Sequence, residues 1–476
     1  MSGLPKGWKS TELESLLSFV LGGDWGKAPD FSEEGYLDAF CIRGTEFKHW
    51  KKDKGITSVQ RKLKASSLES RTLQLNDILI EISGGGPDQP VGRTVLIDKE
   101  ALQVNSTYPK VCTNFIRLAR PSCQVYAPYL NHYLHFFYLS GEVTKYQGGS
   151  NNLRNLKFKE YSKIEIPVPP YNEQIRIANK LDSILVKVDK AQVRLDQIPL
   201  ILKRFRQSVL AAATSGELTK EWREERSLLF SDWREFGFSE LLFKIRSGSG
   251  SKPVDESENG IRILRSSAVR NLAVNYNDHR YLPDNSEIKE LDYLSNDDLL
   301  FTRLSGSLEY VGNCARVQGI EENTVQYPDR LFCAKLKDPK QSKYLEMYFS
   351  SPMFSKYIAA SIKSSAGHQR ITLGVIKDAK VIIPSEAEQE IIVGRVNKLF
   401  AKASRIEKQY LDAKARLDRL TQSILAKAFR GELVPQDPND EPAEKLLERI
   451  VAEKEQNKSK KTTRKRTTKA KTAEKE

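Results

Sequence analysis

The sequence lacks long hydrophobic runs, an apolar leader and paired cysteines. No stretch of its 476 residues approaches the roughly 18 consecutive apolar residues that suggest a membrane-spanning helix. The N-terminal segment from Met1 to Trp8 has no apolar signal-peptide core. None of the five cysteines stands in a CxxC spacing, so we expect buried thiols in a reducing cytoplasm and neither disulfides nor a zinc site.

Catalytic motifs are also missing. No GxxxxGK[ST] phosphate loop occurs, and no GxGxxG follows a predicted strand. The segments 83–86 and 247–251 are glycine-rich but lack the required spacing and a following helix, so we interpret them as exposed loops. Val168-Pro169-Pro170-Tyr171 resembles the Asn/Asp-Pro-Pro-Tyr motif of amino-methyltransferases, but valine replaces the residue that must hydrogen-bond the target amino group. The sequence therefore predicts no catalytic residue and no cofactor site in this chain.

Two weaker patterns of chemistry have plainer interpretations. Pro283-Asp284 followed by Glu287-Ile288-Lys289 resembles the acid-and-lysine pattern of nucleases, but its carboxylates are too close in sequence to lie on separate strands. We interpret it as a polar turn that enters a helix. His132 and His135 fit one helix face without a third ligand, so no metal site is predicted.

Length and charge indicate two globular domains and a polyanionic partner. The chain is too long for one core, and its formal net charge is +14. Half of this charge lies in the low-complexity tail 458–476, which we expect to be disordered. The basic remainder fits either nucleic acid binding or a plain solvated surface.

An internal repeat organises the chain. Residues 422–433 and 207–218 match at 8 of 12 positions with a constant offset of 215. The register holds without a gap back to Glu173-Gln174 and Glu388-Gln389. Fainter matches precede it, such as Trp8 with Trp233. Such self-similarity predicts a duplicated protein.

The repeat divides the chain into six segments. Short apolar runs, including the predicted strand 77–82 and the predicted buried helix 129–139, indicate α+β domains. The predicted organisation is an N-terminal globular domain, a first helical region, a C-terminal globular domain, a second helical region, a short helix and the basic tail, with bounds 1–165, 166–221, 222–382, 383–434, 435–457 and 458–476.

The two helical regions carry apolar seams. In the second, apolar positions from Leu399 to Ile424 alternate in steps of four and three, as in a coiled coil. Pro199 interrupts the first, where we expect a kink or break. Gly216 and Gly431 stand where a helix stop is required.

Two seams of matched length predict an antiparallel helix pair between the two similar domains. About 45 helical residues at ~1.5 Å each give a rod of roughly 65 Å. The alternative is that each helix packs separately on its own domain. Beyond Leu433, we expect Asp440 to cap a short helix that has Pro442 in its first turn.

Polar loops with arginine recur in both domains. A first set is 41–44 and 263–267, a second is 83–93 and 302–307, and a third is 151–155 and 368–370. Arg, Asn, Gln and Ser reach base edges in the major groove, while Lys suits phosphates. Each loop alone fits an ordinary polar surface, but the recurrence favours DNA binding. The candidate DNA-binding residues are Arg43, Arg93, Asn152, Arg154, Lys252, Arg265, Arg303, Ser305, Gln369 and Arg370.

The motifs that flank the helices carry a family resemblance. Residues 166–174, with the pattern Ile-Pro-x-Pro-Pro-x-x-Glu-Gln, and residues 422–433 are similar to the specificity subunit of a type I restriction–modification system. The opening Leu4-Pro5-Lys6-Gly7-Trp8 also fits. The resemblance runs from there to about residue 455.

The resemblance implies a DNA-recognition and scaffold subunit. It implies two target recognition domains, each reading one half of a bipartite asymmetric DNA sequence, and a helical spacer that sets the gap. It further implies two modification subunits, which use S-adenosylmethionine to methylate adenine at N6 and dock on the spacer. Two restriction subunits that use ATP and Mg²⁺ complete the implied complex.

Two alternatives remain open from the sequence. One is an enzyme, either a fused methyltransferase–specificity chain or a nuclease, which would need the motifs that are missing here. The other is an orphan or antirestriction decoy, a coiled-coil protein that binds modification subunits without sequence preference on DNA.

Overall fold

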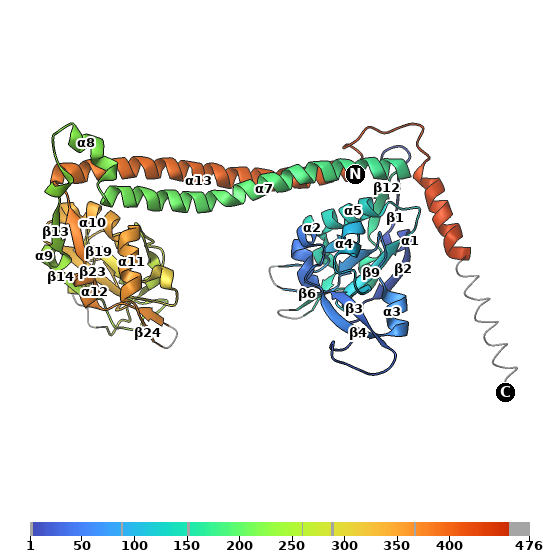
Figure 1. Ribbon diagram of the computed structural model, residues 1–476, viewed down its shortest axis with the longest axis horizontal. Helices are drawn as coiled ribbons and strands as arrows, with labels where there is room; N and C mark the ends of the chain where they lie inside the picture. Colours follow the sequence, from blue (N-terminus) through green and yellow to red (C-terminus); the bar gives the residue numbers. More distant parts are fainter. Residues whose placement is uncertain are drawn as a thin grey trace. The chain divides into compact units, whose positions relative to one another are not determined.

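The computed structural model describes residues 3–86, 89–149, 153–258, 260–286, 290–365 and 368–456. The chain divides into two compact units (Figure 1). Unit 1 comprises Met1–Val193 with Ala413–Glu476, and unit 2 comprises Arg194–Asp412. Among the described residues, no helix combines the length and apolar character of a membrane span. The described ranges also contain no group of three or more His, Cys, Asp or Glu that could hold a metal ion.

Unit 1 is built on a four-stranded antiparallel sheet. The predicted strand 77–82 is β5 (Ile78–Glu81), an interior strand of this sheet with all four residues buried. Ile78 and Ile80 pack with Leu130 and Leu134 of helix α5 (Ala127–Leu139), while Leu79 joins a second cluster. Successive side chains of a strand point to opposite faces of the sheet, which explains this alternation.

The sheets of unit 1 are, in order, β2 (Leu17–Gly22), β9 (Ile116–Pro121), β5 and β7 (Thr94–Leu96); β4 (Val59–Lys64), β3 (Tyr36–Ile42) and β8 (Lys110–Cys112); β10 (Gln147–Gly148), β11 (Arg154–Leu156) and β6 (Ser83–Gly85); and the pair β1 (Lys9–Glu12) and β12 (Glu165–Val168). The α-helices before the long one are α1 (Leu13–Leu16), α2 (Trp50–Asp53), α3 (Ala65–Arg71), α4 (Lys99–Gln103), α5 (Ala127–Leu139) and α6 (Phe158–Tyr161).

Unit 2 repeats these four sheets. Their orders are β14 (Leu242–Ser247), β23 (Leu331–Leu336), β19 (Leu299–Thr302) and β21 (Cys314–Arg316); β18 (His279–Tyr281), β15 (Arg262–Leu264) and β22 (Val325–Gln326); β24 (Lys363–Ser365), β25 (His368–Arg370) and β20 (Leu304–Ser305); and β13 (Arg234–Gly237) with β26 (Lys380–Ile383). A hairpin, β16 (Val269–Arg270) with β17 (Ala273–Val274), is added. The short α-helices are α8 (Lys220–Glu224), α9 (Phe238–Leu241), α10 (Ser342–Phe349), α11 (Pro352–Ser361) and α12 (Leu373–Lys377).

The duplication extends to individual hydrogen bonds. The Trp8 indole N–H donates to Glu173 at 3.0 Å, and that of Trp233 donates to Glu388 at 2.9 Å. The Tyr129 hydroxyl donates to the Pro167 carbonyl, and its counterpart Tyr344 donates to Ile382. The predicted duplication is therefore confirmed in topology and in buried contacts.

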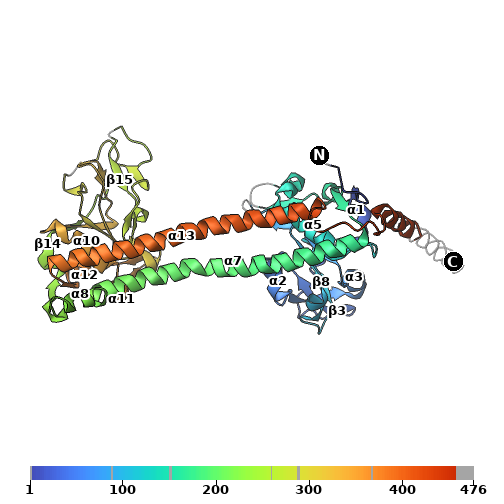
Figure 2. The same cartoon turned by 90° about the horizontal axis from the view of Figure 1, so that it is seen from above.

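Two long helices follow the domains in sequence, α7 (Tyr171–Thr214) and α13 (Glu386–Phe429) (Figure 2). In unit 1, the beginning of α7 packs on the end of α13 through a cluster that includes Leu181 and Phe429. In unit 2, Arg206 near the end of α7 pairs with Glu407 at 2.7 Å. Within each unit the two helices thus run antiparallel, as the matched seams predict.

Three predicted features of the long helices are a break at Pro199, stops at two glycines and a buried apolar seam. α7 runs through Pro199 without interruption, so the prediction of a break there is wrong. Gly216 and Gly431 follow the helix ends with φ of +78° and +76°, which confirms the predicted stops. The predicted seam is only partly buried, since Ala403 is buried while Ile406 and Leu420 are about half exposed.

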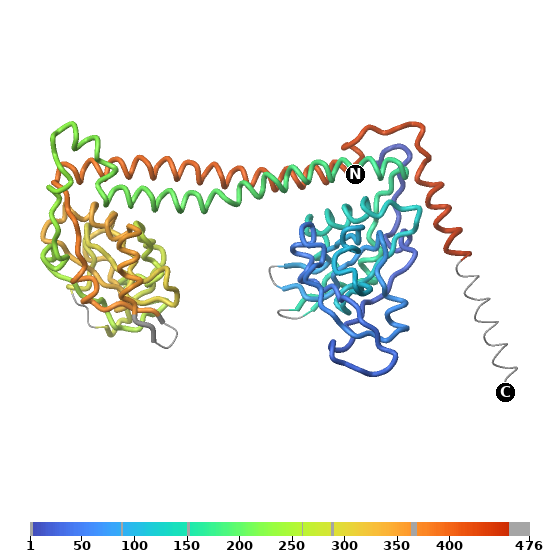
Figure 3. The backbone as a smooth tube through the Cα atoms, viewed as in Figure 1, coloured from blue at the N-terminus to red at the C-terminus, as the bar shows by residue number. Residues whose placement is uncertain are grey.

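A C-terminal helix spans 443–456 and belongs to unit 1 (Figure 3). The Ala443 N–H donates to the Gly7 carbonyl at 2.9 Å, and Leu446 and Ile450 join the core that contains β5. The predicted helix is confirmed, but the predicted role of Asp440 is wrong. Its carboxylate accepts from Arg176 at 2.7 Å, and the helix begins only at residue 443, so Asp440 does not stand at the N-cap position.

Further predictions concern the glycine-rich segment 83–86, the cysteines, the histidine pair on one helix and the basic tail. Residues 83–85 form strand β6 and are not a plain loop, because the β11 backbone supplies partners for them. Cys123 is exposed, unlike the other four cysteines. His132 is hydrogen-bonded to Asp182, with 2.9 Å between the imidazole Nε2 and the carboxylate Oδ1. The tail 458–476 and Glu287-Ile288-Lys289 lie outside the described residues.

Candidate nucleic-acid interface

The second and third sets of predicted loops are adjacent in both units. In unit 1, β6 pairs with β11, which sets Asn155 opposite Ser83 and Arg154 opposite Gly85. In unit 2, β20 pairs with β25, which sets Leu304 opposite Arg370 and Ser305 opposite Gln369. Segments about 70 residues apart in unit 1 therefore share one small sheet, and the arrangement recurs in unit 2.

The first loop set joins them in unit 1. A cleft of about 910 Å³ is lined by Arg43 and Gly44 from the first set, by Ser83 and Arg93 from the second, and by other residues that include Phe115. The cleft is open and mixes polar with aromatic side chains. Such a concave surface suits an extended partner that presents both charge and flat apolar edges.

Arg43 and Arg93 are engaged within unit 1. Arg43 pairs with Glu46 at 2.6 Å and donates to the Thr57 carbonyl at 3.1 Å. Arg93 donates from Nε to Glu81 at 2.8 Å and from Nη2 to the Gly44 carbonyl at 2.9 Å. The hydrogen bonds that Arg93 donates to the Glu81 carboxylate raise the pKa of Arg93. These carboxylates compete with any outside acceptor for the two guanidinium groups.

The candidates of unit 2 are less strongly held. Arg265 lies 3.8 Å from Asp278 with about half of its side chain exposed. Arg303 donates to the Asp329 carbonyl at 3.1 Å and lies over the Phe332 ring. Lys252 and Arg370 are exposed, and both belong to loops or short strands where a ligand could reach them.

The remaining candidates complete this comparison. Arg154 is exposed on β11. The Ser305 hydroxyl accepts from the Ser307 N–H at 3.2 Å, and Gln369 is partly buried in β25. Asn152 lies outside the described residues. The structure therefore gathers the described unit 1 candidates around the small sheet and the cleft, and it pairs three unit 2 candidates in β20 and β25.

One element of the site escaped the sequence interpretation. The turn between β8 and β9 exposes Asn114 and Phe115, and the equivalent turn between β22 and β23 exposes Asp329 and Arg330. The offset of 215 relates both pairs, so extending the repeat register backward past Glu173 would have aligned them.

Comparison with known proteins decides the family. No family model matches the chain. It is 35% identical to the type I restriction enzyme EcoKI specificity subunit of Escherichia coli strain K12, over 97% of this chain and 99% of that protein. It is 32% identical to the StySPI specificity subunit of Salmonella potsdam over the same shares. The chain belongs to the type I restriction enzyme specificity subunits.

Solved structures agree with this specificity subunit in fold. A chain from a study of complex assembly and conformational transition of the type I R-M system matches with a TM-score of 0.61 at 15% identity, over 91% of this chain and all of the other. The HsdS subunit of Thermoanaerobacter tengcongensis matches with a TM-score of 0.51 at 16% identity, over 90% and 98%. A specificity subunit is a recognition component of a restriction–modification complex and is not itself an enzyme.

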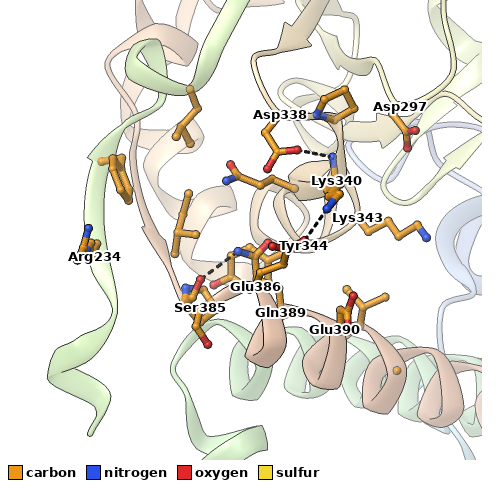
Figure 4. A pocket seen from close by; sticks show the side chains of 18 of the residues that line it. Arg234, Asp297, Asp338, Lys340, Lys343, Tyr344, Ser385, Glu386, Gln389 and Glu390 are labelled. Carbon is orange, nitrogen blue, oxygen red and sulfur yellow. Dashed lines mark hydrogen bonds and ion pairs between the residues drawn. The ribbon is translucent and has the colours of Figure 1, made fainter. Parts of the chain in front are cut away.

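The specificity subunit also has a groove in unit 2 that is lined by both polar and apolar side chains (Figure 4). Its volume is about 920 Å³, and Arg234, Lys340, Glu386 and Gln389 are among its lining residues. Lys340 bridges to Glu386 at 3.0 Å. Arg234 and Ile383 are the counterparts of Lys9 and Val168, which pair in unit 1. In unit 1 this region meets the C-terminal helix, since Lys9 pairs with Glu444 and Val168 joins the cluster of Leu446.

Proposed function

We propose that this subunit selects the DNA sequence on which its restriction–modification complex acts. Each unit reads one half of a bipartite asymmetric target. The observation that carries the proposal is the pair of similar loop arrangements, repeated once in each unit of a chain that belongs to the specificity subunits. Two domains with one topology and different loop residues suit two different half-sequences.

The loop residues divide by the contacts that their chemistry allows. Arg154, Arg265 and Arg370 are exposed at these loops and suit guanine edges or phosphates. Lys252 suits a phosphate, because its point charge attracts without selecting a base. Arg43, Arg93 and Arg303 would need to exchange an internal bond for a DNA contact. We propose that these three orient their loops as much as they bind.

The long helices set the gap between the half-sequences and dock the modification subunits. In unit 1, Val186 and Val193 of α7 are more than half exposed, and in unit 2 so are Ile201 and Leu411. Apolar side chains left in water along a helix pair favour a partner that covers them. The complex would contain two modification subunits and two restriction subunits.

The cofactors belong to those partners in this proposal. The modification subunits would use S-adenosylmethionine to methylate adenine at N6, and the restriction subunits would use ATP and Mg²⁺. This chain would hold none of them. The free thiols fit action in the cytoplasm.

The test is a genome-wide map of adenine methylation in cells with and without this gene. The proposal predicts a bipartite motif with a fixed gap that disappears on deletion. An unchanged map, with the modification subunit expressed, would contradict it and favour a decoy that binds modification subunits without reading DNA.

A further inference from the structure

Phe115 and Arg330 occupy the same place in the two units. Each stands at the end of the turn before an interior strand, β9 in unit 1 and β23 in unit 2. The Phe115 carbonyl accepts from the Ile82 N–H at 2.8 Å, and the Arg330 carbonyl accepts from the Arg303 N–H at 2.9 Å. Ile82 and Arg303 each follow the other interior strand, β5 or β19. The backbone is therefore the same and the side chain differs.

The surroundings of this turn include residues of the predicted DNA-binding loops and, in unit 2, the glycine-rich segment 247–251. In unit 1, Phe115 lines the cleft with Arg43 and Arg93. In unit 2, the Asp329 N–H donates to the Ser249 carbonyl at 2.8 Å. The Asp329 carbonyl accepts from Arg303. The loops thus hold the turn in place, which fixes the direction from which its side chain can contact a ligand.

Both side chains are available to a ligand. Phe115 is 53% exposed, and Trp25, which lines the same cleft, is 37% exposed. Arg330 is exposed, and within the described ranges no hydrogen bond or ion pair engages its guanidinium group. Arg43, Arg93 and Arg303, by contrast, already have internal acceptors. Phe115 and Arg330 are therefore both exposed at this turn and can be reached by a ligand.

We propose that Phe115 and Arg330 are base-reading residues, one for each half of the DNA target. This inference rests on the proposed function. Phe115 has no hydrogen-bonding group and suits the 5-methyl group of thymine in the major groove. Arg330 presents two parallel donors that match O6 and N7 of guanine. The same backbone position thus selects a different base in each unit.

The experiment maps adenine methylation in cells that co-express this chain with the modification subunit of its own system. Phe115→Ala should relax one base position in one half of the motif, and Arg330→Ala one position in the other half. Methylation at sites with a substituted base should rise about 10- to 100-fold relative to the intact motif. Phe243→Ala, at a phenylalanine that is 75% exposed on β14, and Lys356→Ala on α11 are matched controls that should leave the motif unchanged.

Conservative variants separate base reading from other roles. Arg330→Lys keeps the positive charge but loses the two parallel N–H donors of the guanidinium group. It should therefore relax the same base position as Arg330→Ala. If Arg330→Ala weakens methylation at all sequences alike and Arg330→Lys restores it, Arg330 binds phosphate and the inference is wrong. If a variant abolishes methylation with unchanged thermal melting, Phe115→Leu or Arg330→Lys must restore a relaxed motif, and failure to do so contradicts the inference.

Failure of the proposed function and failure of the assignment of Phe115 and Arg330 give different results. A wild-type chain that yields no bipartite motif overturns the proposed function itself. A clear wild-type motif whose base requirements are untouched by both alanine variants overturns only the assignment of Phe115 and Arg330.

Discussion

Glu173 and Glu388 occupy equivalent buried positions but have different partners. Glu388 accepts from Trp233, from Thr219 at 2.7 Å and from the buried Arg223 at 2.6 Å. Glu173 accepts from Trp8 through one oxygen, while its other oxygen has no partner among the described residues. Burial raises the pKa of Glu173. The duplication has kept the acid and changed the balance of charge around it.

Replacement of the glutamate by glutamine should therefore destabilise unit 2 much more than unit 1. Glu388→Gln leaves the Arg223 charge buried without its carboxylate, and should lower the free energy of unfolding of unit 2 by about 3–5 kcal/mol. Glu173→Gln loses no ion pair and still accepts from Trp8, so the change in unit 1 should stay within about 1 kcal/mol. Urea unfolding followed by tryptophan fluorescence measures both. Equal losses would contradict this assignment.

His135 on α5 should make unit 1 sensitive to acid. The pKa of His135 is lowered to about 4, and burial of the imidazole is the largest cause of this shift. Between its ordinary pKa of about 6.5 and that value, the unfolded chain binds a proton that the folded chain does not. The stability contribution of neutral His135 is thus present above pH 6.5, roughly, and is lost as the pH falls toward the folded pKa. His135→Phe should flatten this part of the curve of unfolding free energy against pH. An unaltered slope would show that other groups cause it.

At the scale of elements, alanine substitutions at two glycines of the second long helix region should change the free energy of unfolding in opposite directions. The backbone conformation at each glycine decides the direction. Gly431 has φ of +76°, and a Cβ there would lie 2.4 Å from Pro5 Cγ. Gly394, inside α13, has nothing within 4 Å of such a Cβ. Gly431→Ala should lower the unfolding free energy by about 1–2 kcal/mol, while Gly394→Ala should raise it by about 0.5–1 kcal/mol. Thermal melting followed by circular dichroism compares the two, and a gain at Gly431 would be the contrary result.

The C-terminal helix should be an integral part of the unit 1 core. Leu446 is 2% exposed and packs in the cluster that contains Leu13 and Ile78, while Val451 on the same helix is 56% exposed. Leu446→Ala should therefore cost unit 1 about 2–5 kcal/mol of unfolding free energy, and Val451→Ala should cost little. Chemical denaturation of both variants is the measurement. Similar small effects would mean that the helix contributes little to the core.

At the scale of the whole chain, the sequence predicts the domain organisation better than the geometry of the candidate DNA-binding site. Repeat offset, seam spacing and the two stop glycines predict duplicated domains and antiparallel helices because these signals are local or periodic. The pairing of β6 with β11 is not predictable in this way, because it joins distant short segments that have no periodicity. The internal carboxylate partners of Arg43 and Arg93 also depend on tertiary contacts, so exposure of those arginines could not be inferred.

The central claim is that each unit reads its own half of one DNA target. Its most direct test replaces residues 13–164 by a second copy of 238–379, joining the chain just after β1 and β13 end and before β12 and β26 begin. The methylation motif of this variant, expressed with the modification subunit, should contain the unit 2 half-sequence twice and no trace of the other half. A motif that keeps both original halves would contradict the account.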